Sequence, residues 1–183
     1  MIPAARAAAA IEVLADIETR HRPAADAMKD WGLAHRFAGS GDRAAISALV
    51  YDVLRKKSSS TWIMGEAGPR AEVLGALRQT QDLDADAIAA LFSGDGHAPA
   101  KLTEAECERL TAADLSGAPS HVLGDFPEWL APQLEASFGA SAAEEGRALA
   151  ERAPVDLRVN TLKTTRDKAL RALAHLKPEL MPL

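Results

Sequence analysis

The sequence predicts a mainly α-helical protein whose last part is the first β-α pair of a small α+β unit. Of its 183 residues, 39 are alanine, and only 4% are aromatic. Alanine is the best helix former, whereas β-branched and aromatic residues favour strands. Apolar residues also recur at helical spacing along most of the chain. Because 48% of the residues are hydrophobic, the chain can bury a sizeable core in one domain or two small ones.

Three helices are predicted in the first third of the chain, at residues 4–20, at 23–37, and at a segment that ends with Arg55, Lys56 and Lys57. The third is the clearest, because its apolar residues follow the full i, i+3, i+4, i+7, i+8 pattern. These residues are Ile46, Leu49, Val50, Val53 and Leu54. Either Ser40 or Asp42 is expected to cap this helix, since short oxygen-bearing side chains accept hydrogen bonds from the first N–H groups.

The middle of the chain predicts shorter elements. Three serines at 58–60 are expected to turn the chain before a short apolar helix at 61–64. Further helices are expected at 69–80, 84–92 and 103–110. Thr103 and Glu106 have the spacing of a capping box, in which each side chain accepts a hydrogen bond from the other residue's backbone N–H. They therefore mark the start of the last of these helices.

The character of the sequence changes after residues 116–127, which contain two glycines and two prolines and predict a boundary. Helices are expected at 127–138 and 142–152. Residues 155–160, Val-Asp-Leu-Arg-Val-Asn, then alternate apolar and polar side chains. This alternation is typical of a strand with one buried face. A helix at 165–176 follows, so the chain ends in a β-α pair without a second strand.

The charge balance excludes a protein that coats nucleic acid with its whole surface, because the formal net charge is -5. Residues 63–118 carry four basic and ten acidic side chains, whereas 152–177 carry seven basic and two acidic ones. The single cysteine, Cys107, excludes an internal disulfide and fits a cytoplasmic protein. No apolar run approaches the roughly 20 residues that span a bilayer, so no membrane association is expected.

Known catalytic patterns are absent from the sequence. It has no glycine-rich phosphate loop, no His-Glu-x-x-His pair and no Gly-x-Ser-x-Gly elbow. The five histidines are scattered, and Cys107 lies between Glu106 and Glu108, whose charges disfavour a reactive thiolate. We therefore expect no catalytic residue, no metal site and no cofactor in this chain.

The basic residues are the remaining candidates for a site, and we interpret them as RNA-binding. Arg55, Lys56 and Lys57 close a helix, where positive charge also suits the negative end of the helix dipole without any ligand. Arg158 and Asn160 share one face of the predicted strand, and Lys163 follows it. This second group either contacts RNA or pins a neighbouring loop by hydrogen bonds. Both interpretations of each group stay open at this point.

Two segments carry a resemblance to a known family. Pro127-Glu128-Trp129-Leu130, followed by Arg152-Ala153-Pro154-Val155-Asp156-Leu157-Arg158-Val159-Asn160-Thr161, resembles the region before the catalytic domain of Sun/Fmu-type RNA (cytosine-5)-methyltransferases. Upstream, the stretch from Asp42 to Trp62 and Ile63 is similar to their N-terminal domain. That domain resembles the antitermination factor NusB, a helical RNA-binding fold. The resemblance implies a NusB-like helical domain at 1–118, and connector helices with the start of an RNA-recognition-like α+β domain at 119–183.

The resemblance also implies what the chain lacks. Enzymes of this family bind S-adenosylmethionine through an Ala-Ala-Pro-Gly-Gly type loop and use cysteines in Thr-Cys and Pro-Cys contexts, and none of these motifs is present. The expectation is a truncated N-terminal region that binds ribosomal RNA and positions it for a missing C-terminal methyltransferase domain, where S-adenosylmethionine would bind. Because the strand lacks a partner, self-association through it is also expected. The alternative function is a NusB-like protein-interaction module, since the acidic middle suits a basic partner.

Overall fold

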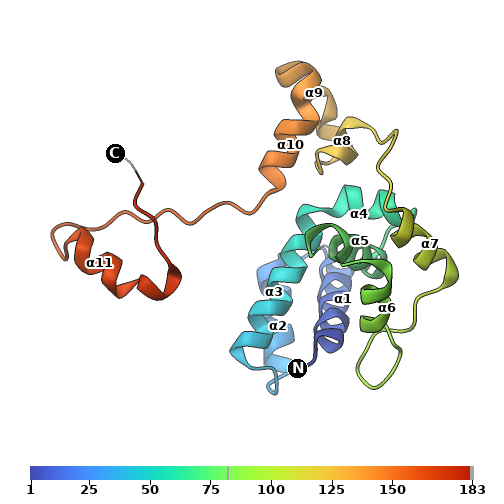
Figure 1. Ribbon diagram of the computed structural model, residues 1–183, viewed down its shortest axis with the longest axis horizontal. Helices are drawn as coiled ribbons and strands as arrows, with labels where there is room; N and C mark the ends of the chain where they lie inside the picture. Colours follow the sequence, from blue (N-terminus) through green and yellow to red (C-terminus); the bar gives the residue numbers. More distant parts are fainter. Residues whose placement is uncertain (82, 182–183) are drawn as a thin grey trace. The chain divides into compact units, whose positions relative to one another are not determined.

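The computed structural model describes residues 1–81 and 83–181, and the described chain is mainly helical, with no strand (Figure 1). It divides into two compact units, Met1–Glu151 and Arg152–Leu183. The helices of the first unit are α1 (Pro3–Arg20), α2 (Ala24–Ala34), α3 (Ser40–Arg55), α4 (Lys57–Met64), α5 (Pro69–Thr80), α6 (Ala85–Leu91), α7 (Glu104–Ala112), α8 (Ser120–Leu123), α9 (Ala131–Phe138) and α10 (Ala142–Ala150), with short 3₁₀ turns at Glu128–Leu130 and Gly139–Ser141. None of the described helices is both long and apolar enough to cross a membrane.

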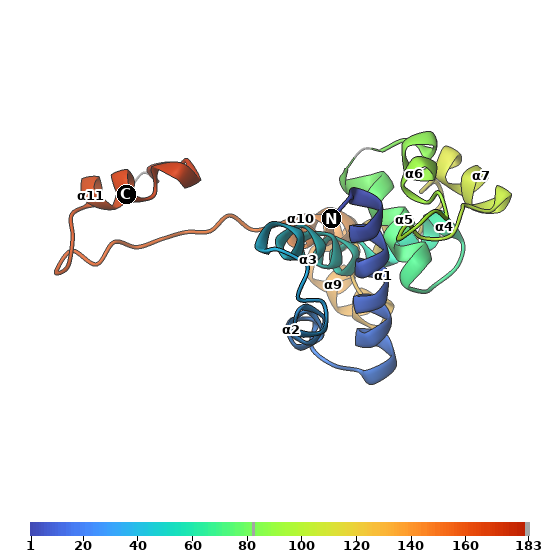
Figure 2. The same cartoon turned by 90° about the horizontal axis from the view of Figure 1, so that it is seen from below.

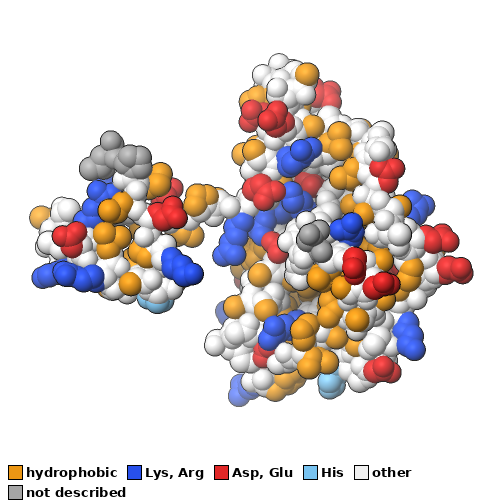
Figure 3. Space-filling model, viewed as in Figure 1, with side chains coloured by type: hydrophobic (Ala, Val, Ile, Leu, Met, Phe, Trp, Pro, Cys, Tyr) orange, Lys and Arg blue, Asp and Glu red, His pale blue; other side chains and the backbone are white. Residues whose placement is uncertain are grey.

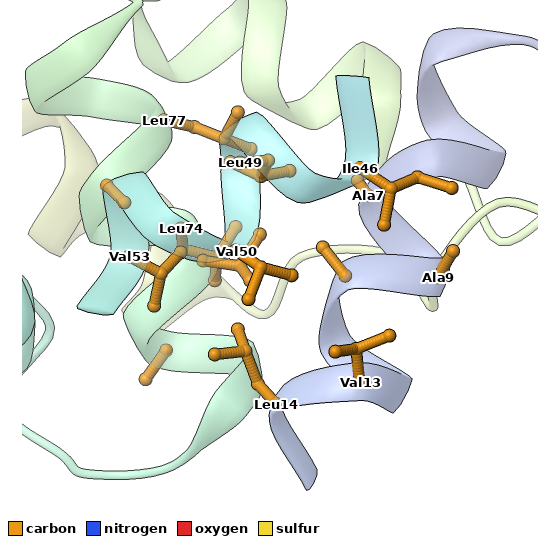
Figure 4. Close-up of a cluster of buried hydrophobic side chains, with 14 of the residues drawn as sticks. Ala7, Ala9, Val13, Leu14, Ile46, Leu49, Val50, Val53, Leu74 and Leu77 are labelled. Atoms are coloured by element: carbon orange, nitrogen blue, oxygen red, sulfur yellow. The ribbon is translucent and has the colours of Figure 1, made fainter. Parts of the chain in front are cut away.

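The core of the first unit forms where α1, α3 and α5 pack against one another (Figures 2 and 4). The predicted apolar stripe of α3 is confirmed, since Ile46, Val50 and Val53 are fully buried. On α1, the facing residues are largely alanines, which let the helix backbones approach closely. They are Ala7, Ala9 and Ala10, with Val13 and Leu14 one turn further on. The abundance of alanine therefore has a packing role as well as a helix-forming one.

Two of the predicted helix caps can be compared with the structure. The capping box is confirmed: Thr103 Oγ1 accepts from the Glu106 N–H at 3.2 Å, and the Thr103 N–H donates to Glu106 Oε2 at 2.8 Å. The cap predicted for α3 is wrong, because the N-cap residue is Gly39 and no side chain caps the helix. Asp42 instead accepts hydrogen bonds from the N-terminal amine of Met1 at 3.0 Å and from Arg6 at 3.0 Å.

The serine run is helical rather than a turn. Residues 58–60 lie inside α4, which begins directly after a break of the helical backbone at Lys56. Ser59 and Ser60 are buried, and a Cβ added at Gly75 of α5 would lie only 2.6 Å from the Ser60 Cα. Small side chains are needed here because the backbones of α4 and α5 nearly touch. The residues that suggested a turn therefore mark a close helix–helix contact.

Residues 119–151 lie in the same compact unit as the helices before them, so the predicted domain boundary at 118/119 falls inside this unit. The link to α4 is made by Asp125, whose carboxylate accepts hydrogen bonds from the backbone N–H and the hydroxyl of Ser59 at 2.8 and 2.9 Å. Phe126 is buried beside it between Gly124 and Gly146. The assignment of 1–118 and 119–183 to separate domains stays a prediction.

The second unit contains α11 (Arg166–Ala172), a 3₁₀ turn at Ala174–Leu176, and an extended segment before them. The helix expected at 165–176 thus forms in two pieces, but the strand expected at 155–160 does not, and with it the predicted β-α unit is not formed. A strand needs a partner for its backbone N–H and C=O groups, and the described residues offer none. Val155 and Leu157 of the alternating row remain exposed, beside an apolar groove of about 630 Å3 that Leu170 and Leu173 also line.

Candidate nucleic-acid interface

The three basic residues predicted at a helix end lie where α3 passes into α4. Arg55 is the last residue of α3, Lys56 breaks the helical conformation, and Lys57 begins α4. All three side chains form ion pairs inside the first unit. Arg55 pairs with Asp52 one turn earlier in α3, and both side chains are partly exposed. Partly exposed pairs of this kind contribute at most about 1 kcal/mol, so this pair leaves Arg55 able to exchange Asp52 for a phosphate.

Lys56 is more buried than Arg55 and pairs with carboxylates that are distant in sequence. Its Nζ lies 3.1 Å from Glu151 Oε1 and 4.0 Å from Asp125 Oδ2, and its side chain is only 14% exposed. Burial raises the pKa of Asp125, although hydrogen bonds from Ser59 and the charge of Lys56 act in the opposite direction. Lys56 therefore supplies the positive charge that the buried Asp125 carboxylate needs, and it ties the end of α10 to the start of α4.

Lys57 pairs with two carboxylates from other helices. Its Nζ contacts Glu18 of α1 and lies 3.0 Å from Oε1 of Glu72 in α5. The Glu72 side chain is 1% exposed, and burial raises its pKa against the opposing effect of Lys57. Burial also acts to lower the pKa of Lys57, but its interactions with the Glu18 and Glu72 carboxylates raise it overall. No hydrogen bond of good geometry reaches either Glu72 oxygen from the described residues, so the ion pair with Lys57 is its main compensation.

The other predicted group, Arg158, Asn160 and Lys163, lies in the second unit. The Arg158 and Lys163 side chains are exposed, and neither contacts a carboxylate or another hydrogen-bonding group among the described residues. Asn160 behaves differently, because its Oδ1 accepts a hydrogen bond from the backbone N–H of Leu162 at 3.1 Å. Asparagine commonly stabilises a turn in this way. Asn160 thus orders the turn that carries Lys163, which agrees with the loop-pinning interpretation of its role.

The surface of the first unit is mixed in charge. On the face shown in Figure 3, basic and acidic side chains lie next to one another rather than in separate patches. A groove of about 1050 Å3 opens beside Lys57, with an apolar lining that includes Trp62, Ile63 and Val122. Glu66, Asp114 and Glu128 supply acidic groups to it, against the basic Arg109. This groove is better suited to a cationic peptide than to a phosphate backbone.

Sequence reasoning missed an aromatic cluster at the end of α2, formed by Trp31, His35 and Phe37. The rings of Trp31 and His35 stack at 4.2 Å with an angle of 15°, and Phe37 meets His35 edge-on at 5.7 Å. Phe37 is 73% exposed. The sequence signal was present as Trp31-x-x-x-His35-Arg36-Phe37, which combines an i, i+4 aromatic pair with a basic residue.

One comparison with known proteins gives a match. Residues 126–181 match the family model described as "Methyltr_RsmF/B-like, ferredoxin-like domain". The matched segment includes Pro127-Glu128-Trp129-Leu130 and the residues from Arg158 to Lys163, and it supports the relation of this part of the chain to RsmF/RsmB-like methyltransferases. No curated protein and no solved structure matches the chain significantly.

Proposed function

We propose that this chain is the RNA-binding, substrate-positioning N-terminal region of an S-adenosylmethionine-dependent ribosomal RNA cytosine-C5 methyltransferase, with a NusB-like first domain. The observation that carries the proposal is the match of residues 126–181 to the ferredoxin-like domain model. The composition of the later part of this region supports it, since seven of the residues from Arg152 onward are basic and three are acidic. Chemistry on the cytosine and the binding of S-adenosylmethionine belong, in this proposal, to a catalytic domain outside this chain.

Within this proposal, Arg158 and Lys163 are the leading phosphate contacts, because their side chains have no partner among the described residues. Asn160 holds the turn between them in shape. Arg55, Lys56 and Lys57 take a secondary role, since a phosphate has to compete with carboxylates that already neutralise them. Localisation in the cytoplasm, where ribosomal RNA is modified, is part of the same proposal.

We expect the variant with Arg158→Ala and Lys163→Ala to bind single-stranded ribosomal RNA more weakly than the wild type. Each lost phosphate contact makes the slope of log K against log salt shallower by about 0.7 for single strands. The measurement is fluorescence anisotropy of a labelled RNA titrated at several salt concentrations. Lys101→Ala is the matched control, because it removes an exposed positive charge from the acidic middle of the chain.

The acidic residues of the middle provide a second control. Asp82 lies outside the described residues, and Asp84 caps α6 through the Ala87 N–H, so the suitable position is the exposed Asp86. Asp86→Ala is expected to change the affinity less than the variant without Arg158 and Lys163. An unchanged affinity and slope in the latter would contradict these contacts.

The protein-interaction module is the second candidate function, and the groove beside Lys57 favours it. Its apolar lining with acidic groups at Glu66, Asp114 and Glu128 suits a basic, partly apolar segment of a protein partner. Binding to a protein that persists in high salt, together with no measurable RNA affinity, would support this function over the first.

We also propose that residues 155–160 mediate self-association as an antiparallel strand pair. If Leu157 faces its own copy, Asp156 of one chain lies opposite Arg158 of the other, and Val155 lies opposite Val159. The pairing would satisfy both backbones, and opposite charges would meet twice. Slow hydrogen exchange along 155–160 in a chain shown to be monomeric would argue against it, since that protection would need an internal partner.

A charge exchange tests this register. Asp156→Arg should weaken dimerisation by about 2- to 30-fold, because two favourable cross-strand pairs become repulsive. Asp156→Arg combined with Arg158→Asp should restore the wild-type dissociation constant, measured by sedimentation equilibrium. Equal dissociation constants for all three proteins would exclude the proposed pairing.

A further inference from the structure

We propose that the aromatic cluster at the end of α2 is a stacking platform for an unpaired base of RNA, with Arg36 and Arg43 contacting the adjacent phosphates. This inference rests on the proposed RNA-binding function and names a surface of the first unit for it. It begins from Phe37, a residue that is 73% exposed although the first unit has an extensive core. Single exposed apolar side chains are common, so exposure alone assigns nothing. The assignment rests on the aromatic contacts that hold this ring and on the arginines near it.

The ring of Phe37 contacts His35, which in turn stacks on the buried Trp31. Trp31 is buried and held by a hydrogen bond from its Nε1 to Glu12 Oε2 at 2.9 Å. His35 stacks on Trp31, and its Nδ1 donates to the Trp31 carbonyl oxygen at 2.9 Å. Phe37 then contacts His35 in a T-shaped arrangement, with an angle of 85° between the two rings. Contacts that restrict a ring before binding reduce the conformational entropy lost when it stacks on a flat partner.

Two arginines belong to the loop that carries this ring or are bonded to it. Arg36 is exposed, and its side chain has no ion pair or hydrogen bond with a described residue. Arg43 is held against the same loop by a hydrogen bond from its Nε to the Ala38 carbonyl oxygen at 2.9 Å. The carboxylate next to it in sequence, Asp42, is occupied by the Met1 amine and Arg6. Unlike Lys56 and Lys57, these two guanidinium groups have no carboxylate partner among the described residues.

An exposed aromatic ring, with two nearby arginines that have no carboxylate partner among the described residues, fits single-stranded RNA. Stacking of a base on an aromatic side chain contributes substantially to single-strand binding and tolerates any sequence, and arginine adds phosphate contacts. In a duplex the base faces are covered by their neighbours, so the same surface should discriminate against paired RNA. The platform would hold an unpaired loop or end of the substrate, which is a positioning role rather than a catalytic one.

The test compares Phe37→Ala, Phe37→Trp and Arg36→Ala by fluorescence anisotropy with a labelled mixed-sequence single-stranded RNA of about 12 nucleotides. Phe37→Ala should weaken binding by about 5- to 100-fold without changing the salt slope, because stacking releases no counterions. Phe37→Trp should bind within about twofold of the wild type, since the indole ring also stacks. Arg36→Ala should make the slope shallower by about 0.7.

Leu33→Ala is the matched control, because Leu33 is an exposed apolar residue in the last turn of α2 and has no aromatic ring. It should bind as the wild type does. The platform would be overturned if Phe37→Ala bound RNA with normal affinity, or if a duplex of the same sequence competed as well as the single strand. Either result would indicate that the exposed ring contacts a protein partner instead. Absence of RNA binding by the wild-type chain would instead overturn the proposed function itself, so the two failures are distinguishable.

Discussion

Replacing Gly75 with alanine is expected to lower the free energy of unfolding of the first unit by about 1–3 kcal/mol, the usual cost of overpacking a core. The added Cβ would lie 2.6 Å from the Ser60 Cα and 2.8 Å from the Ser60 carbonyl oxygen. Both are backbone atoms, so α4 and α5 have to separate to relieve the clash. Helix propensity acts in the opposite direction, because alanine is favoured over glycine in a helix by about 1 kcal/mol. The predicted sign is therefore a direct test of the close contact.

Gly41→Ala is the matched control for this prediction. Gly41 is an exposed glycine in the first turn of α3, and a Cβ added there would meet nothing within 4 Å. We expect this substitution to stabilise the protein by up to about 1 kcal/mol through propensity alone. Urea denaturation followed by circular dichroism measures both variants. Equal or increased stability of Gly75→Ala would show that α4 and α5 are not in backbone contact.

The helical core was predictable because its signal is local. The stripe Ile46, Val50 and Val53 repeats within one helix, and the same repeat determines which face is buried. The capping box at Thr103 and Glu106 is local as well, and it forms as expected. Such patterns need no knowledge of which segments meet in the fold, so the sequence alone is enough to identify them.

Features that depend on contacts between distant segments were not predictable. The serine run at 58–60 suggested a turn, because its close neighbour Gly75 belongs to another helix. The carboxylates that neutralise Lys56 and Lys57 lie far away in sequence, with Glu151 95 residues and Glu18 39 residues distant. A cluster of basic residues therefore suggested a phosphate site where the fold has largely used those charges internally.

The strand expected at 155–160 shows a third kind of limit. The alternation of Val155, Leu157 and Val159 with polar residues describes what the segment would do beside another strand. A strand is a property of a pair, because each backbone needs the other's hydrogen bonds. The alternating pattern of one segment indicates that it favours the strand conformation. It does not identify the strand with which the segment would pair. Arg158 and Lys163 are exposed, and the RNA contacts expected of them stay a prediction.

Replacing Lys57 with methionine is expected to destabilise the first unit by about 1–3 kcal/mol at neutral pH, the usual cost of leaving a buried polar group without its partner. Methionine replaces the apolar stem of lysine with one of nearly the same length and lacks the ammonium group, so the loss reports mainly on the charge. Glu72 is 1% exposed and would then hold a carboxylate with no countercharge from Lys57. Arg55→Met is the matched control, because its pair with Asp52 is local and partly exposed, and we expect a cost below about 1 kcal/mol.

The pH dependence gives this prediction a signature that a packing defect would not show. Burial raises the pKa of Glu72 above the ordinary value of 4.5, and removing Lys57 removes the main effect that opposes this rise. A raised carboxyl pKa means that the folded protein binds the proton more tightly than the unfolded chain. The resulting stabilisation is fully present below pH 4.5 and is lost as the pH rises through the folded pKa. The difference between Lys57→Met and the wild type should therefore be small in acid and largest at neutral pH.

Glu72→Gln in the Lys57→Met background completes the argument, because it removes the buried charge and keeps a side chain of nearly the same shape. The double variant should be more stable than Lys57→Met alone at pH 7, by urea denaturation, and its stability should depend less on pH. A double variant no more stable than the single one would mean that Lys57 contributes packing rather than charge compensation. The double variant also separates the two roles of Lys57, charge compensation and phosphate binding. If its stability is restored but its RNA affinity is lower, the loss of affinity is due to a missing phosphate contact and not to unfolding.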